Sequence, residues 1–185
     1  MEEIGLFPLG LVLLPTEQVP LHIFEPRYRE LITECLDEGE PFGLVFADDD
    51  GLRRVGTLAS VVEVTDRFDD GRLNVVVEGG ERFRLVELTD GRTFHTGTIE
   101  PLGDLEDPPN PSEVESPDVG AGPPSFAIAA RFELAPDLKL ELLEQTSERL
   151  RLARLCEILE TAAASVERQR AIAALAQTNG HAKPS

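Results

Sequence analysis

Short apolar runs separated by prolines make up the beginning of the chain. The apolar runs at 4–9, 11–14 and 19–24 are broken by prolines, which exclude a helix and suit short strands at the edge of a sheet. Pro26 then stands where a first helical residue would, and apolar side chains recur at three- and four-residue spacing until Gly39. The pattern predicts edge strands followed by one amphipathic helix.

The next segment, up to residue 101, consists of short runs rich in valine, leucine, phenylalanine and threonine. Strands are expected at 42–47, 56–64, 72–78, 82–88 and 94–100. Three Asp-Gly pairs and the pair Gly79-Gly80 lie among these runs, and Asp-Gly between apolar runs is a strong hairpin signal because both residues tolerate positive φ. The expected fold class is α+β, with an antiparallel, closed or nearly closed β structure and one inserted helix.

A stretch with six acidic residues, six prolines and no basic residue follows this β region, at 102–124. It cannot bury enough apolar surface to offset the entropy of ordering, so an extended linker is predicted. Helical spacing returns at 125–132, at 136–144 and from Ser147 onward, where an apolar stripe to Val166 predicts one packed face. The expected organisation is a β domain at 1–101, a linker at 102–124, a helical subdomain at 125–177 and a disordered tail at 178–185.

Charge and lysine usage exclude several functions. The formal net charge is −18, from 35 acidic and 17 basic residues, so the surface should repel a phosphate backbone and nucleic-acid binding is not expected. The lysines are Lys139 and Lys183, and neither lies in the glycine-rich setting of a nucleotide-binding loop. A Ser-Lys catalytic dyad would have to use one of the same two residues.

The N-terminus and the cysteines indicate a cytoplasmic protein. The N-terminal apolar run is broken by prolines and follows Glu2-Glu3 instead of a cationic stretch, so neither a signal peptide nor a membrane span is predicted. Cys35 and Cys156 are too few for a disulfide framework and have no metal-ligand spacing around them. We expect no membrane association, no metal and no cofactor.

Five short motifs resemble one known family, the N-terminal substrate-recognition domain of the Lon proteases. In order, they are LFPL at 6–9, LPTEQVPL at 14–21, IFEPRYR at 23–29, VGTLA at 55–59 and EGGERFR at 78–84. The resemblance covers residues 4–101 and returns more weakly in LLE at 142–144 and SERL at 147–150. Similar domains occur in cereblon-like and stand-alone bacterial proteins.

The resemblance implies a PUA-like β-barrel followed by a helical subdomain. In the full-length proteases this region precedes an ATPase module and a Ser-Lys protease module, whereas this chain ends near the place where the ATPase would begin. We therefore expect a non-catalytic module that binds unfolded or apolar segments of other proteins, or that acts as an adaptor to a larger machine. Self-association through the helical part, giving a homo-oligomer, stays open.

Seven residues near these motifs are the site candidates. Four apolar residues are expected to contact a bound peptide: Leu9, Leu21, Phe24 and Tyr28. Three charged residues are expected to act as polar anchors of the fold: Glu25, Arg27 and Arg82. No catalytic residue is predicted, because no nucleophile and base are paired in the pattern and Cys35 falls on the apolar side of its helix.

Two alternatives remain beside peptide binding. The PUA-like fold implied by the resemblance would also suit an RNA-binding protein, although the net charge opposes it. A hydrolase is the second alternative, and it would require titratable residues such as His95 to converge in a pocket.

Overall fold

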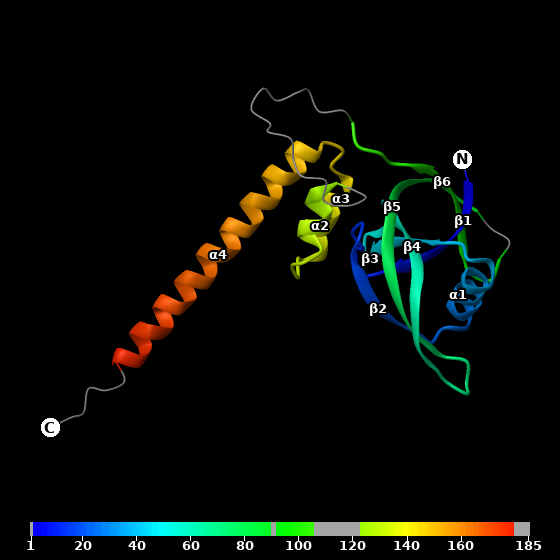
Figure 1. Cartoon of the computed structure of the whole chain (residues 1–185), viewed down its shortest axis with the longest axis horizontal. Coiled ribbons are helices and arrows are strands. Elements are labelled where there is room, and N and C mark those ends of the chain that lie inside the picture. The colour runs from blue at the N-terminus through cyan, green and yellow to red at the C-terminus, as the bar shows by residue number, and fades with distance from the viewer. Residues whose placement is uncertain (1, 90–91, 106–122, 180–185) are drawn as a thin grey trace.

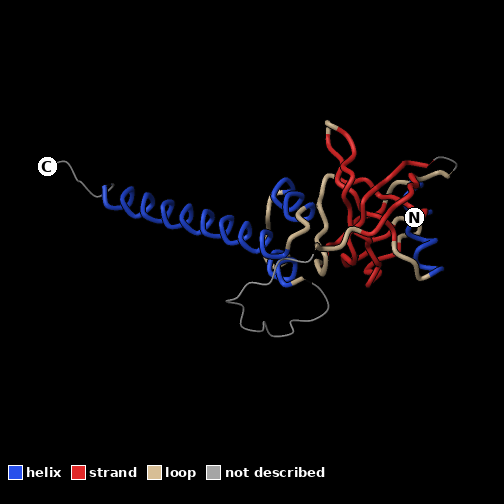
Figure 2. Tube along the Cα trace, turned by 90° about the horizontal axis from the view of Figure 1, so that it is seen from above, coloured by secondary structure: helices blue, strands red, loops and turns tan. Residues whose placement is uncertain are grey.

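The computed structural model describes residues 2–89, 92–105 and 123–179, with side chains as far as residue 173. A sheet region lies at one end of the molecule, two short helices lie beside it, and a long helix extends away from both (Figures 1 and 2). In chain order the elements are β1 (Glu2–Leu9), β2 (Gln18–Ile23), α1 (Pro26–Glu38), β3 (Phe42–Asp48), β4 (Gly51–Arg67), β5 (Leu73–Thr89), β6 (His95–Pro101), α2 (Pro124–Ala129), α3 (Pro136–Glu144) and α4 (Glu148–Asn179).

The strands form one sheet in the order β2-β5-β4-β3-β1-β6, and β5 also pairs with β6. The long strand β5 makes this possible, because its first half pairs with β2 and its second half with β6. The pairings β5–β4–β3–β1–β6–β5 therefore form a closed circuit, while β2 and the adjoining halves of β4 and β5 extend beyond it. The α+β class expected from the sequence is confirmed.

The expectation of a purely antiparallel sheet is wrong for one pair of strands. β1 runs parallel to β3, with Leu6 opposite Gly43. Parallel neighbours need a long crossover connection, and here β2 and α1 lie between the two strands in the chain. The inserted helix is thus part of the connection that brings β3 back parallel to β1.

Two local expectations also differ from the structure. The run at 11–14 is buried, apart from the half-buried Leu11, but it is not a strand, because Pro15 follows and Thr16 takes a positive φ of 69°. We call residues 11–15 the buried loop. The pair Gly79-Gly80 is not a turn, since β5 continues through it. A Cβ on Gly79 would lie 2.1 Å from the carbonyl oxygen of Leu14, so this glycine lets the buried loop approach the strand.

Three apolar cores hold the described elements together. One lies between α1 and the sheet and contains Phe7, Tyr28 and Phe42. A second is formed by the closed circuit around Phe83. The third joins the sheet to the helices, and its members include Val12, Leu14, Val55, Phe126, Leu142 and Leu155. The buried loop supplies side chains to the first and the third cores, so it connects the α1 side to the helical side.

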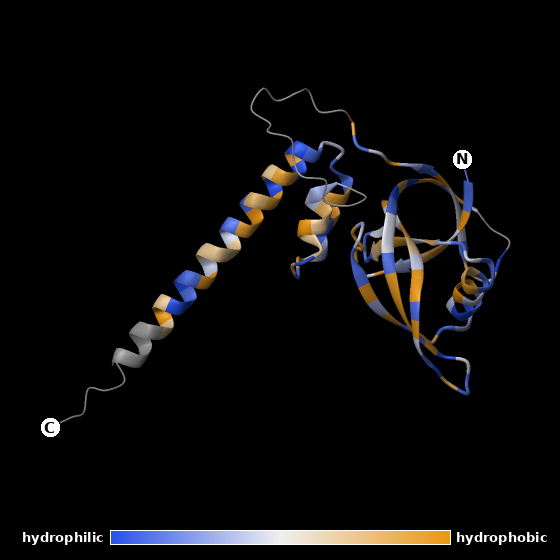
Figure 3. Cartoon of the chain, in the orientation of Figure 1, coloured by the Kyte–Doolittle hydropathy of each residue, from blue (hydrophilic) through white to orange (hydrophobic). Residues whose placement is uncertain are grey.

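The long helix α4 is packed only at its beginning. Leu155 and Ile158 are buried, whereas every residue from 160 to 173 is exposed, including the apolar Val166, which the sequence pattern predicted to lie on a packed face. Hydrophobic and hydrophilic residues are interspersed along α4 (Figure 3). The packed face thus ends near Leu159. In the described part of the chain, no helix combines the length and the apolarity that crossing a bilayer would require.

Candidate functional site

Apolar side chains point to solvent from the part of the sheet that extends beyond the closed circuit. Along β2, Leu21 and Ile23 are buried while Pro20 and His22 are exposed, and Pro20 lies opposite Val76 of β5. We call this surface the outer face, formed by Pro20, His22, Phe24, Phe68 and Val76.

An aromatic cluster lies at one end of the outer face. Phe24 follows β2 and Phe68 follows β4, and their side chains are 60% and 39% exposed. The His22 ring lies between them, with its centroid 5.9 Å from that of Phe24 and 6.1 Å from that of Phe68. Its Nδ1 lies 2.6 Å from Oδ1 of Asn74, which fixes the orientation of the ring.

The backbone beside this cluster is available to a partner. Among the described strands, β2 is hydrogen-bonded to β5 alone, so its other edge is free. A free edge can accept an extended segment as an added strand. Pro20 lacks a backbone N–H and is suited to such an edge position.

The structure separates the four residues expected to contact a peptide. Phe24 is exposed, but Leu21 and Tyr28 are buried in the core beneath α1, and Leu9 packs against that same core. The Tyr28 ring stacks on Phe7 with the ring centroids 4.0 Å apart, and burial raises the pKa of its hydroxyl. Of the four, Phe24 is therefore the residue best placed to touch a ligand.

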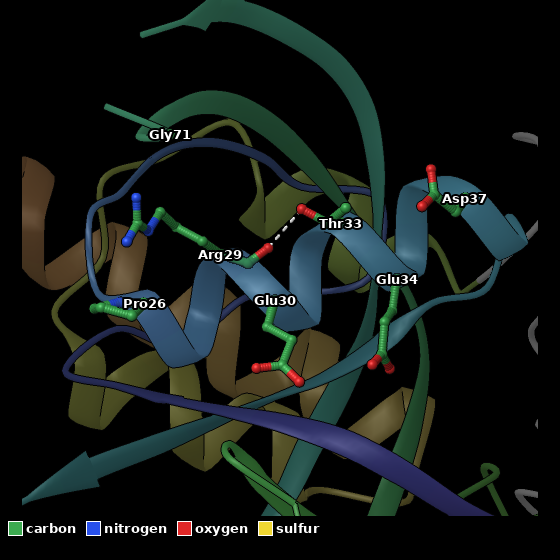
Figure 4. A pocket seen from close by; sticks show the side chains of 7 residues that line it. All are labelled: Pro26, Arg29, Glu30, Thr33, Glu34, Asp37 and Gly71. Carbon is green, nitrogen blue, oxygen red and sulfur yellow. Dashed lines mark hydrogen bonds between the residues drawn. The ribbon is translucent and has the colours of Figure 1, made fainter. Parts of the chain in front are cut away.

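The charged residues at the start of α1 are paired with each other and with the hairpin between β4 and β5. Glu25 and Arg27 form an ion pair at 2.9 Å, and the Arg27 guanidinium lies 4.5 Å from the centroid of the Tyr28 ring. Arg29 donates a hydrogen bond to the carbonyl oxygen of Asp70 and reaches toward Gly71 over a shallow depression, whose lining also includes three acidic residues of α1 (Figure 4). These contacts hold the hairpin against the helix.

A groove of about 790 Å³ opens at the other end of β2, where none of the described strands pairs with one side of β5. We call it the β5 groove. Its lining includes Pro15, Gly80, Glu81, Leu102 and Phe126. The groove is thus bounded by the buried loop, by the end of β6 and by α2.

The third polar anchor, Arg82, lies behind the β5 groove in a buried network. Its guanidinium donates to the backbone carbonyls of Leu143 and Gln145, at 2.7 and 2.9 Å. Arg82 and Arg151 both bind the carboxylate of Asp104. We call the set Arg82, Asp104, Ser125, Glu148 and Arg151 the junction network, since it connects β5 to the helices.

Arg151 is the centre of the junction network, with a side chain that is 0% exposed. Burial lowers the pKa of the Arg82 guanidinium, and Asp104 opposes this shift. Burial acts on Arg151 in the same direction, but hydrogen bonds with Asp104 and Glu148 outweigh it and raise its pKa. The two arginines differ because Arg151 has two carboxylate partners, whereas Arg82 has one and is repelled by Arg151.

Cys35 and His95 are the residues that the sequence analysis weighed for catalytic chemistry. Among the described residues, no three His, Cys, Asp or Glu residues are grouped so as to hold a metal ion. Burial and the neighbouring Glu34 and Glu38 raise the pKa of Cys35 to about 11, which suppresses its thiolate. His95 is exposed on β6.

Sequence reasoning missed Phe68, Val76 and Arg151. Phe68 stands two residues before the Asp-Gly pair at 70–71, and an aromatic residue at a hairpin tip is a usable signal for exposure. Arg151 carried no such signal, because its surroundings come from segments that are far apart in the chain.

Comparison with known families gives a match over residues 3–119. The matching model describes the substrate-binding domain of the ATP-dependent protease La (LON). Lon protease 1 of Hydrogenovibrio crunogenus is 30% identical over 98 residues, which are 49% of this chain and 12% of that protein. The Lon protease of Parabacteroides distasonis is 29% identical over 124 residues, which are 62% of this chain and 15% of that protein. The chain thus corresponds to a small part of these proteases.

Two solved structures have a similar fold. The Lon N-terminal domain protein from Xanthomonas campestris aligns with a TM-score of 0.66 and 24% identity, over 85% of this chain and 98% of that one. The N-terminal domain of the Mycobacterium avium complex Lon protease aligns with a TM-score of 0.60 and 16% identity, over 84% of this chain and 97% of that one. At these identities the likeness establishes the fold.

Proposed function

Because the chain belongs to the family of the substrate-binding domain of the ATP-dependent protease La (LON), we propose that it captures extended apolar segments of other proteins at the outer face. Membership of the family, which the five motifs indicated, makes the chain a substrate-recognition module. The apolar nature of the segments, the place where they bind and the absence of catalysis are our proposal.

The observation that carries the proposal is the exposed aromatic cluster beside the free edge of β2. Phe24 and Phe68 lie outside the buried core and expose apolar surface to solvent. A contiguous apolar patch on a protein surface commonly marks an interaction site. An extended segment added to β2 would gain backbone hydrogen bonds, and its alternate side chains would reach these rings. Recognition of this kind is tolerant of sequence, as a substrate-recognition module requires.

The proposal includes the finer description of the fold. The closed circuit of strands supports a PUA-like barrel, with β2 and the hairpin between β4 and β5 as an extension. The net charge of −18 favours protein ligands over RNA. A gel shift at low salt with single-stranded RNA is accordingly expected to give no complex.

A fluorescein-labelled peptide of alternating valine, phenylalanine and threonine tests the site by fluorescence anisotropy. Weak binding, with a Kd of about 0.1–1 mM, is expected for one short edge and one aromatic cluster. Phe24→Ser should weaken this binding by at least about fivefold, because aromatic residues dominate such contacts. The same peptide with N-methyl groups on alternate residues should lose binding, since it cannot donate backbone hydrogen bonds.

Val166→Ser is the matched control. Val166 is 46% exposed on α4, away from the sheet, and its replacement should leave the affinity unchanged. An anisotropy signal that does not rise up to about 1 mM peptide would contradict the proposal, as would equal losses in the two variants.

A further inference from the structure

We propose that the β5 groove is a second peptide subsite, which takes a positively charged side chain together with an adjacent apolar one. The inference rests on the proposed function only in that the ligand is a protein segment. The position, the walls and the charges of the groove each contribute to the assignment.

The position of the groove is a break in the sheet. β2 and β6 pair with the same side of β5, and between them a short stretch of β5 is left open. The last contact before the break is the hydrogen bond from the Thr16 amide to the Gly79 carbonyl, at 2.7 Å. The first contact after it runs from the Leu102 amide to the Arg82 carbonyl, at 2.9 Å. On this side, the described residues provide no strand partner for Gly80 or Glu81.

The walls of the groove are mainly apolar. Pro15 and Leu102 lie on either side of the break, and Phe126 closes the groove from the helical side. The volume of about 790 Å³ falls in the range of about 300–1,000 Å³ that is usual for ligand pockets. It is large enough for two neighbouring side chains of a peptide.

The acidic residues of the groove favour a positively charged side chain in the bound peptide. Glu78 and Glu81 lie in its lining, and in the described part of the chain neither forms an ion pair. Glu78 accepts a hydrogen bond from the neutral Gln18 side chain. The cation of the lining, Arg82, is already committed to Asp104 and to two backbone carbonyls. The groove therefore has uncompensated negative charge above an apolar floor.

A guanidinium group satisfies this combination best. Its planar face tolerates apolar neighbours, while its N–H groups can donate to both carboxylates. The apolar walls accept the side chain next to it in the peptide. Glu78 of the groove lies opposite Gln18, the first residue of β2, whereas the aromatic cluster with Phe24 lies at the other end of this strand. Six extended residues span about 20 Å.

Binding of acetyl-Ala-Phe-Arg-Ala-amide, followed by amide chemical shifts in the full chain, tests the proposal. The largest shifts are expected at Gly80, Glu81 and Leu102. The analogue with citrulline, a neutral isostere of arginine, should bind about threefold more weakly, because the charge attraction is partly exposed to solvent. Equal affinities of the two peptides, or shifts confined to other elements, would overturn the assignment.

Glu81→Gln and Glu87→Gln form a matched pair of variants. Both residues are exposed on β5, and Glu87 is not part of the groove lining. Glu81→Gln should reduce the preference for arginine over citrulline, whereas Glu87→Gln should leave it unchanged. If the two variants had equal effects, the preference for arginine over citrulline would come from the overall negative charge of the protein and not from the groove. This result would refute the subsite.

Phe24→Ser separates this inference from the proposed function. It should leave the affinity for acetyl-Ala-Phe-Arg-Ala-amide unchanged while weakening the binding of the valine-phenylalanine-threonine peptide. If the outer face fails its own test and the groove still prefers arginine, the subsite stands and the proposed function falls. If Phe24→Ser abolishes binding of the arginine peptide, the groove is not an independent subsite.

Discussion

The outer face leaves Phe24 and Phe68 in contact with solvent, whereas the junction between β5 and α4 buries the charged side chains of Arg82 and Arg151. Apolar side chains are thus exposed in one region, and charged side chains are buried in the other. At the junction every buried charge has partners, because Asp104 binds both guanidinium groups and Glu148 binds Arg151. At the outer face the two phenylalanine rings lie against the ring of His22 and leave much of their surface in water.

The two regions differ in whether their side chains stabilise the fold or are available to a ligand. A paired buried charge fixes geometry, because its loss leaves other groups unsatisfied. Exposed apolar surface contributes little to the fold and gains free energy only when a partner covers it. Substitutions at the junction should therefore change stability, and substitutions at the outer face should change binding.

The largest effect is expected from Arg151→Met. Methionine keeps much of the length of the side chain but leaves Glu148 without its cation and removes one of the two cations that bind Asp104. Because these carboxylates are partly exposed, we expect a loss of about 3 kcal/mol in the free energy of unfolding, the low end for breaking a buried pair. Urea denaturation followed by circular dichroism measures it.

Arg154→Met, one turn further along α4, is the control for this variant. Arg154 pairs with Glu141 and Glu157 on the surface, and its replacement should leave the urea midpoint unchanged. A loss for Arg154→Met as large as that for Arg151→Met would contradict a special role of the buried network.

The next largest effect is expected where β5 passes the buried loop, between the two regions. In Gly79→Ala the new Cβ would lie 2.1 Å from the Leu14 carbonyl oxygen, and such overpacking costs about 1–3 kcal/mol. At Gly80 a Cβ would lie 3.4 Å from its nearest neighbour, the Leu58 carbonyl oxygen, so Gly80→Ala should be nearly neutral. Thermal unfolding of both variants checks the difference, and equal melting temperatures would refute the close approach.

The elements of the sheet region followed from local pattern to a large extent. The helix from Pro26 was predicted because a proline, a 3.6-residue apolar period and Gly39 mark its start, face and end. The Asp-Gly pair at 70–71 does lie in a turn, with Gly71 at a φ of 84°. Such features are encoded within a few residues of one another.

Other features depend on contacts between residues that are distant in the chain, and the local pattern did not reveal them. Gly79 was interpreted as a turn residue, because a glycine needed for close approach and a glycine needed for a turn look the same in sequence. Leu21 and Tyr28 were expected to contact a peptide and are instead buried, since an apolar residue near a sheet edge looks the same in sequence whether it faces the core or solvent. The junction network brings Arg82 and Arg151 together from segments far apart in the chain, beyond any local pattern.

A smaller effect, on thiol reactivity, is expected at Cys35, because burial disfavours its charged thiolate form. With its pKa raised to about 11, this thiol should react with iodoacetamide at pH 8 about tenfold more slowly than an unperturbed one. The exposed Cys156 is the internal comparison, and mass spectrometry of the two peptides gives both rates. Equal rates would contradict the shift.

The same shift predicts the direction of a pH effect on stability. The folded chain holds the Cys35 proton up to about pH 11, whereas the unfolded chain releases it near 9. Stability from this group is therefore complete below pH 9 and is lost as the pH rises toward 11. Cys35→Ala should flatten this part of the pH profile.

The smallest effect on stability is expected from Phe24→Ser, and this result would separate the two regions most clearly. Phe24 is 60% exposed, and its ring stacks on the His22 ring. Its loss should therefore change the free energy of unfolding by no more than about 0.5 kcal/mol. Urea denaturation measures this quantity on the same scale as for Arg151→Met. If Phe24→Ser destabilised the chain as strongly as Arg151→Met, the aromatic cluster would be part of the fold, and its exposure would no longer support a role in binding. A near-neutral result, combined with weaker peptide binding, would place the contribution of Phe24 in recognition alone.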